Sequence, residues 1–542
     1  MKEQFTPKLV TTLREGYDAS RLKDDIVAGL TVAIVALPLA MALGIASGAS
    51  PDKGLVTSIV AGFLISALGG SRVQIGGPTG AFVVVISGII SQHGYSGLVL
   101  ATMLAGLILV VAGYAGVGKL MRYIPMPVVT GFTAGIAVII ASSQIGDFLG
   151  LHAREVPAEF FGKWAAYIGA LGTTNLAAFG LGAAALAIIL ILKRLAPRWP
   201  GYLIALTITS VAAVGMHLPV DTVGLRFPDM PTSLPMPHLP SFSMAMLSDV
   251  IGPAFTIAFL AGIEALLSAT VADGMTGYRH RSGQELVGQG AANLASALFG
   301  GLPATGAIAR TATNVRAGGK TPMAGIFHAA FLLVFLLIAG PLIAFIPMAA
   351  LAAVLLIVAW GMSEVDRFKT LMRMNVGERV LLLLTFGLTV LVDLTVAIGV
   401  GVTLASLLFM ARMSEAAGLL PDDEMAEHPD QRAALPPGVE VFQLRGPLFF
   451  GVANEMLDAL SRIGRTPQTV ILRLDRVPYI DSSGIHTLGA FVQQAKATQT
   501  RVILCDMRPS VVTELQRAEP PFAGAETADH FAEALARLAP RP

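Results

Sequence analysis

Two polar residues interrupt a long apolar stretch of this sequence, where they could carry a proton. Glu264 lies between AGI and ALL, and Ser268 follows four residues later on the same helical face. An ionised carboxylate inside a membrane helix costs about 2.5 to 3.5 kcal/mol, so burial favours the protonated form. Glu264 could therefore bind a proton on one side of a membrane and release it on the other. The alternatives are an ion pair between Glu264 and Arg310, and a Ser268 hydroxyl bonded to its own helix backbone.

Two breaks in apolar sequence form a second candidate site. Pro78-Thr79-Gly80 and Pro303-Ala304-Thr305-Gly306 each precede a short apolar segment. Irregular backbone at membrane depth is tolerated only where it is buried in protein or lines a cavity. Two facing half-helices would aim their amide ends, each carrying roughly half a positive charge, at one point that suits an anion. The alternative is a pair of packing breaks with no ligand.

Arg310 follows Gly306 by one helical turn, so its guanidinium could reach back to the same anion. Its fork of donors matches two oxygens of an oxyanion. The alternative is that Arg310 extends to the cytoplasmic surface. His328 in an apolar segment and Asp393 near a turn are assigned to packing and loop roles.

The composition places most of the elements that carry these residues in lipid. The chain has 542 residues, 54% hydrophobic and only 13% charged, whereas soluble proteins have about 25% charged residues. The net charge of +1 gives no basic field for nucleic acid. The single cysteine, Cys505, excludes an internal disulfide and fits packing in a reducing compartment.

Apolar runs predict fourteen membrane spans, of which the third and tenth are short. They cover residues 25–46, 54–70, 79–92, 97–117, 126–149, 175–193, 201–217, 250–273, 285–300, 305–315, 322–338, 341–360, 379–393 and 395–411. Twenty basic residues fall on the N-terminal side of these spans and four on the other side. This asymmetry places both chain ends in the cytoplasm.

Three ordered sequence matches indicate an internal repeat. The segments TVAIVALPLA, GGPTGA and IPM of the first half correspond to TIAFLAGIEA, GGLPATGA and IPM of the second half, at offsets of 225, 225 and 222 residues. Each half has seven spans, so the second half must cross the membrane in the opposite sense. An inverted repeat of this kind is typical of secondary transporters.

Four parts follow from these patterns. They are a cytoplasmic segment (1–23), a transmembrane transport domain (24–412), a polar linker (413–437) and an α/β domain (438–542). The last part alternates predicted strands and helices, including a helix over 454–463.

The chain resembles the sulfate permease family of anion transporters over almost its whole length. The resemblance rests on VAGLTVAIVALPLAMA, GGPTGAFVV, the long stretch from AGIEALLSATVADG to ATGAIARTATNVRAGGKTP, and YIDSSGIHTLG. It implies a core and a gate of seven plus seven inverted spans, a cytoplasmic STAS domain and a homodimer. It also implies an anion site formed by residues of three spans: Thr79, Gly80, Ala81, Glu264, Ser268, Thr305, Gly306, Ala307 and Arg310.

Departures from the family pattern bear on the transported ions. Sodium-coupled bicarbonate members have aspartate and threonine where this chain has Glu264 and Ser268, and threonine in place of Ile308. The glutamate is similar to that of proton-coupled bacterial members, including dicarboxylate carriers. Leu39 replaces a glutamine found in many members, which removes a polar contact to substrate.

The expected function is therefore proton-coupled symport of sulfate or a C4-dicarboxylate, with protons preferred over sodium ions. Bicarbonate transport, and a passive channel or exchanger on the same fold, remain alternatives. We expect no enzyme activity, cofactor, metal or nucleic acid partner, and a bacterial-type plasma membrane location. A phosphate-binding loop is not supported, because Asn314 stands where the leading glycine before Gly319-Lys320-Thr321 should be.

In the STAS-like part, Ser482 matches the serine that is phosphorylated in anti-sigma antagonists. The alternative is that this serine or Asp481 caps the following helix. A sensor in which the membrane part is only an anchor is a third class of function, but fourteen spans exceed what an anchor needs.

Overall fold

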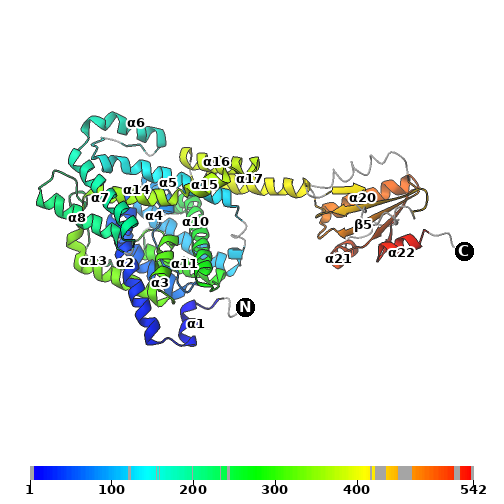
Figure 1. The fold of residues 1–542 in the computed structure, drawn as a ribbon, viewed down its shortest axis with the longest axis horizontal. Helices are drawn as coiled ribbons and strands as arrows, with labels where there is room; N and C mark the ends of the chain where they lie inside the picture. Colours follow the sequence, from blue (N-terminus) through cyan, green and yellow to red (C-terminus); the bar gives the residue numbers. More distant parts are fainter. Residues whose placement is uncertain are drawn as a thin grey trace. The chain divides into compact units, whose positions relative to one another are not determined.

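The computed structural model describes residues 5–119, 124–153, 156–157, 159–197, 199–231, 233–240, 244–392, 394–415, 418–421, 435–449, 467–517 and 525–538. The chain forms two compact units, Met1–Val402 and Thr403–Pro542 (Figure 1). Asp393, most of the predicted linker and the helix predicted over 454–463 lie outside the described residues.

The first unit is helical, and its last helix continues past Val402 into the second unit. Its helices are α1 (Lys8–Glu15), α2 (Ala19–Ala46), α3 (Pro51–Leu68), α4 (Val83–Tyr114), α5 (Met126–Leu149), α6 (Phe160–Ala170), α7 (Leu176–Leu195), α8 (Gly201–Gly215), α9 (Val223–Arg226), α10 (Met244–Thr276), α11 (Ser282–Leu298), α12 (Ile308–Arg316), α13 (Met323–Ile343), α14 (Met348–Met362), α15 (Val365–Leu371), α16 (Val376–Leu391) and α17 (Leu394–Glu415). The short turn η2 (Gly80–Phe82) precedes α4, and two short strands, β1 (Gly76–Gly77) and β2 (Thr305–Gly306), complete the part that holds the site.

A helix covers most of each predicted span. The third and fourth spans correspond to the two helical parts of α4, which are separated at Gly94 by a non-helical backbone with a φ of 69°. Nine helices in the described part of the chain are long and apolar enough to cross a membrane. The chain is a polytopic membrane protein, while the total of fourteen spans stays a prediction.

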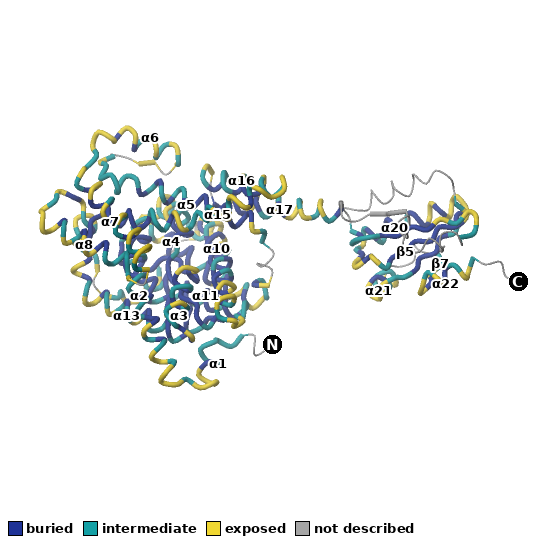
Figure 2. Tube along the Cα trace, viewed as in Figure 1, coloured by how far each residue is buried: buried dark blue, intermediate teal, exposed yellow. Residues whose placement is uncertain are grey.

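The two sequence halves interleave in a reciprocal way. Helix α2 of the first half packs against α13 of the second, and α10 of the second half packs against α4 of the first. With α3, α11 and α12 they form one bundle, whereas α5, α7, α8, α14 and α16 pack into another. Figure 2 shows the buried trace running through α3 and α11, with exposed segments on α6 and α8. This reciprocal pairing agrees with the inverted repeat.

Glycines allow the helices of the first bundle to pack closely. A Cβ added at Gly106 of α4 would lie 2.8 Å from the carbonyl oxygen of Gly290 of α11, and one added at Gly290 would lie 2.5 Å from that of Gly106. Without a hydrophobic driving force between helices in lipid, close backbone approach through small residues is what brings them together.

Two buried carboxylates fix the loops beside the breaks. Glu285 of α11 accepts hydrogen bonds from the backbone amides of Gly70 (2.8 Å) and Ser71 (3.0 Å), just before β1. Asp25 of α2 accepts from the amides of Lys320 (2.9 Å) and Thr321 (3.2 Å), just after α12. Both carboxylates therefore position the segments that carry the site.

The second unit contains a five-stranded sheet. Its elements after α17 are β3 (Gly418–Pro421), β4 (Val439–Arg445), β5 (Thr469–Arg476), α20 (Ser482–Ala497), β6 (Arg501–Cys505), α21 (Pro509–Arg517), β7 (Ala525–Ala528) and α22 (Phe531–Ala536). The strand order is β3-β4-β5-β6-β7, parallel except for the β3–β4 pair. The sequence predicts β4, β5 and β6 from their alternation with helices, but it treats β3 as linker and expects only helices where β7 lies.

Candidate anion site

The two breaks meet in the structure. Strands β1 and β2 pair antiparallel, with Gly76 opposite Gly306 and Gly77 opposite Thr305. The amide of Ala307 extends this pairing by donating to the Ile75 carbonyl at 2.8 Å. Segments that are more than 200 residues apart in the sequence thus form one junction.

Glycine is required at this junction for close approach. A Cβ at Gly306 would lie 1.4 Å from Nε2 of Gln74, and a Cβ at Gly77 would lie 2.2 Å from Nη1 of Arg310. Gly77 also has a φ of 153°, which side chains rarely adopt. Gly80, Ala81 and Ala307 are buried beside these positions.

The helices that begin at the breaks lack side-chain caps. Thr79 precedes η2 and Ala307 precedes α12, and neither contributes a capping hydrogen bond. Asn175 caps α7 and Asn375 caps α16, whereas α3, α5, α11 and α14 also begin without a side-chain cap. The ends of η2 and α12 differ from those other uncapped ends because they meet at the strand pair. The first amides of a helix have no partner within it, so they are the donors that an anion at this junction would use.

Helix α10 passes both breaks and bonds to each. The Thr79 hydroxyl donates to Oε2 of Glu264 at 2.6 Å, and the Thr305 hydroxyl donates to the Ala261 carbonyl at 2.7 Å. Glu264 and Ala261 are one turn apart on α10. The predicted proton-coupling carboxylate therefore lies in direct contact with the first break.

Arg310 is buried at the junction, with 2% of its surface exposed. Its Nη2 donates to the Pro78 carbonyl at 2.7 Å, and its Nη1 lies 3.5 Å from the Ser58 hydroxyl. Among the described residues no carboxylate forms an ion pair with it, and Glu264 bonds to Thr79 instead. Neither alternative for Arg310, an ion pair with Glu264 or a reach to the surface, occurs in this structure.

Ser268 is fully buried, and its hydroxyl donates to Oγ1 of Thr311 at 3.1 Å. The same Thr311 oxygen accepts from the amide of Ile75 at 3.1 Å. Ser268 therefore joins α10 to α12 and does not bond to its own helix backbone. Ser58, Gln74 and Thr311 are residues of the junction that sequence reasoning missed. The only feature of the sequence that could have indicated these three residues is that each is a polar side chain within an apolar stretch.

The second bundle faces the first break. A Cβ at Gly80 would lie 2.4 Å from Sδ of Met362 in α14 and 3.3 Å from Cδ1 of Ile140 in α5. On the second break, the Ile308 side chain is 40% exposed. The first break thus contacts the second bundle, and Ile308 at the second break is not enclosed by protein.

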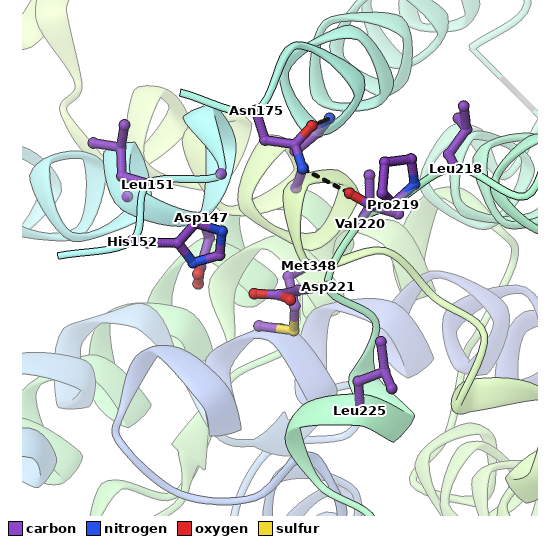
Figure 3. Close-up of a pocket in the computed structure, with 14 residues that line it drawn as sticks. Asp147, Leu151, His152, Asn175, Leu218, Pro219, Val220, Asp221, Leu225 and Met348 are labelled. Carbon is purple, nitrogen blue, oxygen red and sulfur yellow. Dashed lines mark hydrogen bonds between the residues drawn. The ribbon is translucent and has the colours of Figure 1, made fainter. Parts of the chain in front are cut away.

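A separate cavity of about 310 Å³ lies within the second bundle (Figure 3). It is lined by residues of α5, α7, α9 and α14 and the segments beside them, including Asp147, His152, Asn175 and Asp221. Arg226 forms an ion pair with Asp147 at 2.9 Å at this place. None of the predicted anion-site residues lines this cavity, so it is distinct from the junction.

Two further predictions concern metals and the second unit. The described residues contain no group of three or more His, Cys, Asp or Glu side chains that could hold a metal ion. Ser482 is the exposed first residue of α20, and the Asp481 carboxylate caps this helix by accepting from the Gly484 amide at 2.8 Å. Cys505 is buried and forms no disulfide with another residue.

Comparisons with known proteins give the family of both parts. Residues 22–385 match the sulfate permease family, and residues 432–524 match the STAS domain. YvdB of Bacillus subtilis, a protein named for sulfate transport, is 40% identical over 91% of this chain and 93% of its own length. The bicarbonate transporter BicA of Picosynechococcus is 31% identical over 89% of this chain and 88% of its own length.

Solved structures give the same fold. The transmembrane domain of a cyanobacterial bicarbonate transporter BicA is similar with a TM-score of 0.62 and 30% identity, over 71% of this chain and 99% of that chain. Murine Solute Carrier 26 family member A9 is similar with a TM-score of 0.87 over 98% of this chain and 93% of that chain, and its 17% identity supports the fold alone.

Proposed function

Because the chain belongs to the sulfate permease family, we propose that it is a secondary active transporter that couples sulfate or a C4-dicarboxylate to protons. The family comprises transporters and not enzymes, in agreement with the expectation of no enzyme activity. The observation that carries the proposal is the pair of uncapped helix ends that meet beside Glu264 and Arg310.

The proposed binding step uses both breaks. An anion at the junction would accept hydrogen bonds from the first amides of η2 and α12, next to Thr79, Gly80, Ala81 and Ile308. Thr305, Gly306 and Ala307 of the second break hold this geometry through the strand pair. Arg310, which has no carboxylate partner among the described residues, would supply the balancing positive charge.

The proposed coupling step uses Glu264. The hydrogen bond from the Thr79 hydroxyl stabilises the charged form of the carboxylate and so opposes the effect of burial, which favours the protonated form. An approaching anion repels that negative charge and so favours protonation, which links proton uptake to anion binding. Movement of the first bundle against α5 and α14 would then expose the junction to the other side by alternating access.

Bicarbonate is the second candidate substrate. The support is the 31% identity to the bicarbonate transporter BicA across most of both chains. Glu264 and Ser268 depart from the pattern of sodium-coupled bicarbonate members, so we propose protons as the coupling ion for this substrate too. Passive conduction or exchange on the same fold is the remaining alternative.

The proposed setting is the plasma membrane of a bacterium, in a homodimer, with the N-terminus and the STAS domain in the cytoplasm. The support is the similarity to a Bacillus subtilis protein and the basic residues on one side of the predicted spans. Ser482 remains a proposed regulatory position, and its exposure leaves it accessible to a kinase.

Uptake into proteoliposomes tests this proposal. The purified protein is given labelled sulfate, fumarate or bicarbonate, with and without a pH gradient that is acidic outside. Proton symport predicts accumulation above equilibrium only with the gradient. Uptake that stops at equilibrium under every gradient would support the channel instead, and accumulation that requires only a sodium gradient would support sodium coupling.

A further inference from the structure

His328 of α13 is a buried imidazole whose surroundings go beyond simple packing. It has no exposed surface, and neither Nδ1 nor Nε2 has a hydrogen-bond partner. Helix α2 comes so close that a Cβ at Gly29 would lie 3.0 Å from the His328 backbone nitrogen. A buried polar group without a partner costs about 1 to 3 kcal/mol, so an apolar side chain would serve packing better here.

The charged neighbour of His328 is Arg310. The two side chains interact electrostatically, and the helices that carry them, α12 and α13, both pack against α2. The Nε atom of Arg310 is buried and also lacks a partner. A guanidinium Nε–H can only donate, and a neutral imidazole offers one nitrogen that accepts, so the two unsatisfied groups are complementary.

The two Nη groups of Arg310 already have contacts, and these contacts would change if the guanidinium bound an anion. Its Nη2 donates to the Pro78 carbonyl and its Nη1 approaches the Ser58 hydroxyl. To offer both Nη groups to an oxyanion, the guanidinium must release Pro78. A guanidinium that is already fixed by a hydrogen bond at Nε loses less conformational entropy when the anion binds to its two Nη groups.

We propose that His328 is a positioning residue for Arg310, accepting its Nε–H when the guanidinium turns from Pro78 toward a bound anion. This inference rests on the proposed anion site. It assigns His328 a neutral form, because a second cation beside a buried guanidinium would be unfavourable.

The test compares His328→Leu, His328→Gln and the wild type in anion uptake. Leucine removes the acceptor, and we expect the half-saturating anion concentration to rise about tenfold, as for the loss of one hydrogen bond to a charged group. The maximal rate should change less. Glutamine keeps an acceptor and should restore the half-saturating concentration to within about twofold of the wild type.

Leu332→Ala is the matched control. Leu332 lies one turn further along α13 and is also fully buried, so its truncation leaves a cavity in the same helix. This variant should lower the melting temperature and leave the half-saturating concentration unchanged. Equal effects of His328→Leu and Leu332→Ala on that concentration would overturn the inference, as would no effect of His328→Leu.

A binding measurement separates this inference from the proposed function. The melting temperature of each detergent-purified variant is recorded with sulfate or bicarbonate against gluconate at constant ionic strength. The wild type and His328→Gln should be stabilised by the anion, and His328→Leu should lose most of that shift. If the wild type binds the anion but fails to transport it, only the proposed transport is contradicted. Equal shifts in all three proteins would reject the role of His328.

Discussion

At the scale of single residues, the contact between Thr79 and Glu264 is the proposed link between anion and proton. The bond of 2.6 Å joins the first break to a carboxylate that the sequence places in the middle of a predicted span. Sequence reasoning picks out Glu264 because a charge in lipid is expensive, but it cannot name the partner. The structure makes that partner the threonine at the start of η2.

Replacing Glu264 with glutamine should uncouple transport from protons. The amide keeps a similar size but cannot bind or release a proton. We therefore expect Glu264→Gln to lose accumulation driven by a pH gradient while it retains exchange of labelled for unlabelled anion. Both activities are measured in the same proteoliposomes.

The control for this variant is Asp366→Asn, which removes an exposed carboxylate from α15. It should behave as the wild type. Accumulation by Glu264→Gln that still follows the pH gradient would show that another group carries the proton.

At the scale of elements, the paired strands β1 and β2 hold the two breaks together. Their two residue pairs are few, so the close packing of glycines against Gln74 and Arg310 must add to the specificity of this junction. Overpacked positions in a well-packed interior typically cost about 1 to 3 kcal/mol.

Gly306→Ala should therefore destabilise the protein by about 1 to 3 kcal/mol and reduce transport. The added Cβ would lie 1.4 Å from the Gln74 side chain, so Gln74→Ala in the same chain should recover part of the loss. Gly361→Ala in α14 is the control, because its Cβ would meet no atom within 4 Å. The melting temperature and the uptake rate are measured for each. A Gly306→Ala protein as stable and active as Gly361→Ala would rule out this role of the strand pair.

The repeat in the sequence predicted much of this arrangement, because two breaks at matched offsets imply two equivalent places in an inverted fold. The hydrogen bonds from Ile75 and Ser268 to Thr311 were not predictable in the same way. They join residues with no shared periodicity, between elements far apart in the chain. For the same reason, the apolar setting of His328 suggested packing, and only the fold reveals its electrostatic interaction with Arg310.

At the scale of the whole molecule, the N-terminal segment with helix α1 packs against the loops that follow α3 and precede α11 in the first bundle. The amide of Lys8 donates to the Gly69 carbonyl at 3.0 Å, and Arg281 donates to the Thr6 carbonyl at 2.7 Å. Glu15 at the end of α1 pairs with Arg72, which follows α3, at 2.5 Å. These contacts make α1 part of the bundle that carries the proposed anion site.

The pairing of Glu15 gives the docking of α1 a defined pH dependence. Hydrogen bonds from Arg72 hold the pKa of the Glu15 carboxyl below its ordinary value. A lowered carboxyl pKa stabilises the docked form above the ordinary value of about 4.3, and the contribution is lost as the pH falls through the lowered value. Docking should therefore be constant from about pH 5.5 to 8 and weaken only in stronger acid.

A spin label at Leu13→Cys measures the docking of α1, because Leu13 is exposed on this helix. The native Cys505 is buried, so the label should attach to the introduced cysteine. The label should remain equally ordered across the neutral range and become mobile in acid. In a Glu15→Gln background it should be more mobile throughout. Mobility that rises between about pH 8 and 5.5 would mean that another group controls docking.

The substitution Ile308→Pro tests most directly whether the uncapped backbone amides at the two breaks bind the anion. Ile308 is the first residue of α12, where proline fits a helix, and the preceding Ala307 already has the extended backbone that proline favours. The substitution therefore removes one amide donor and keeps the helix. Ile308→Ala retains the donor, and Val376→Pro places proline at the same position of α16 after an extended Asn375.

The measurement is the half-saturating concentration for the anion that the wild type accumulates in proteoliposomes. One hydrogen bond to a charged group contributes about 1.5 to 3 kcal/mol, so Ile308→Pro should raise this concentration at least about tenfold. Ile308→Ala and Val376→Pro should stay close to the wild type. An Ile308→Pro protein with wild-type half-saturation would contradict the claim that the helix ends hold the anion.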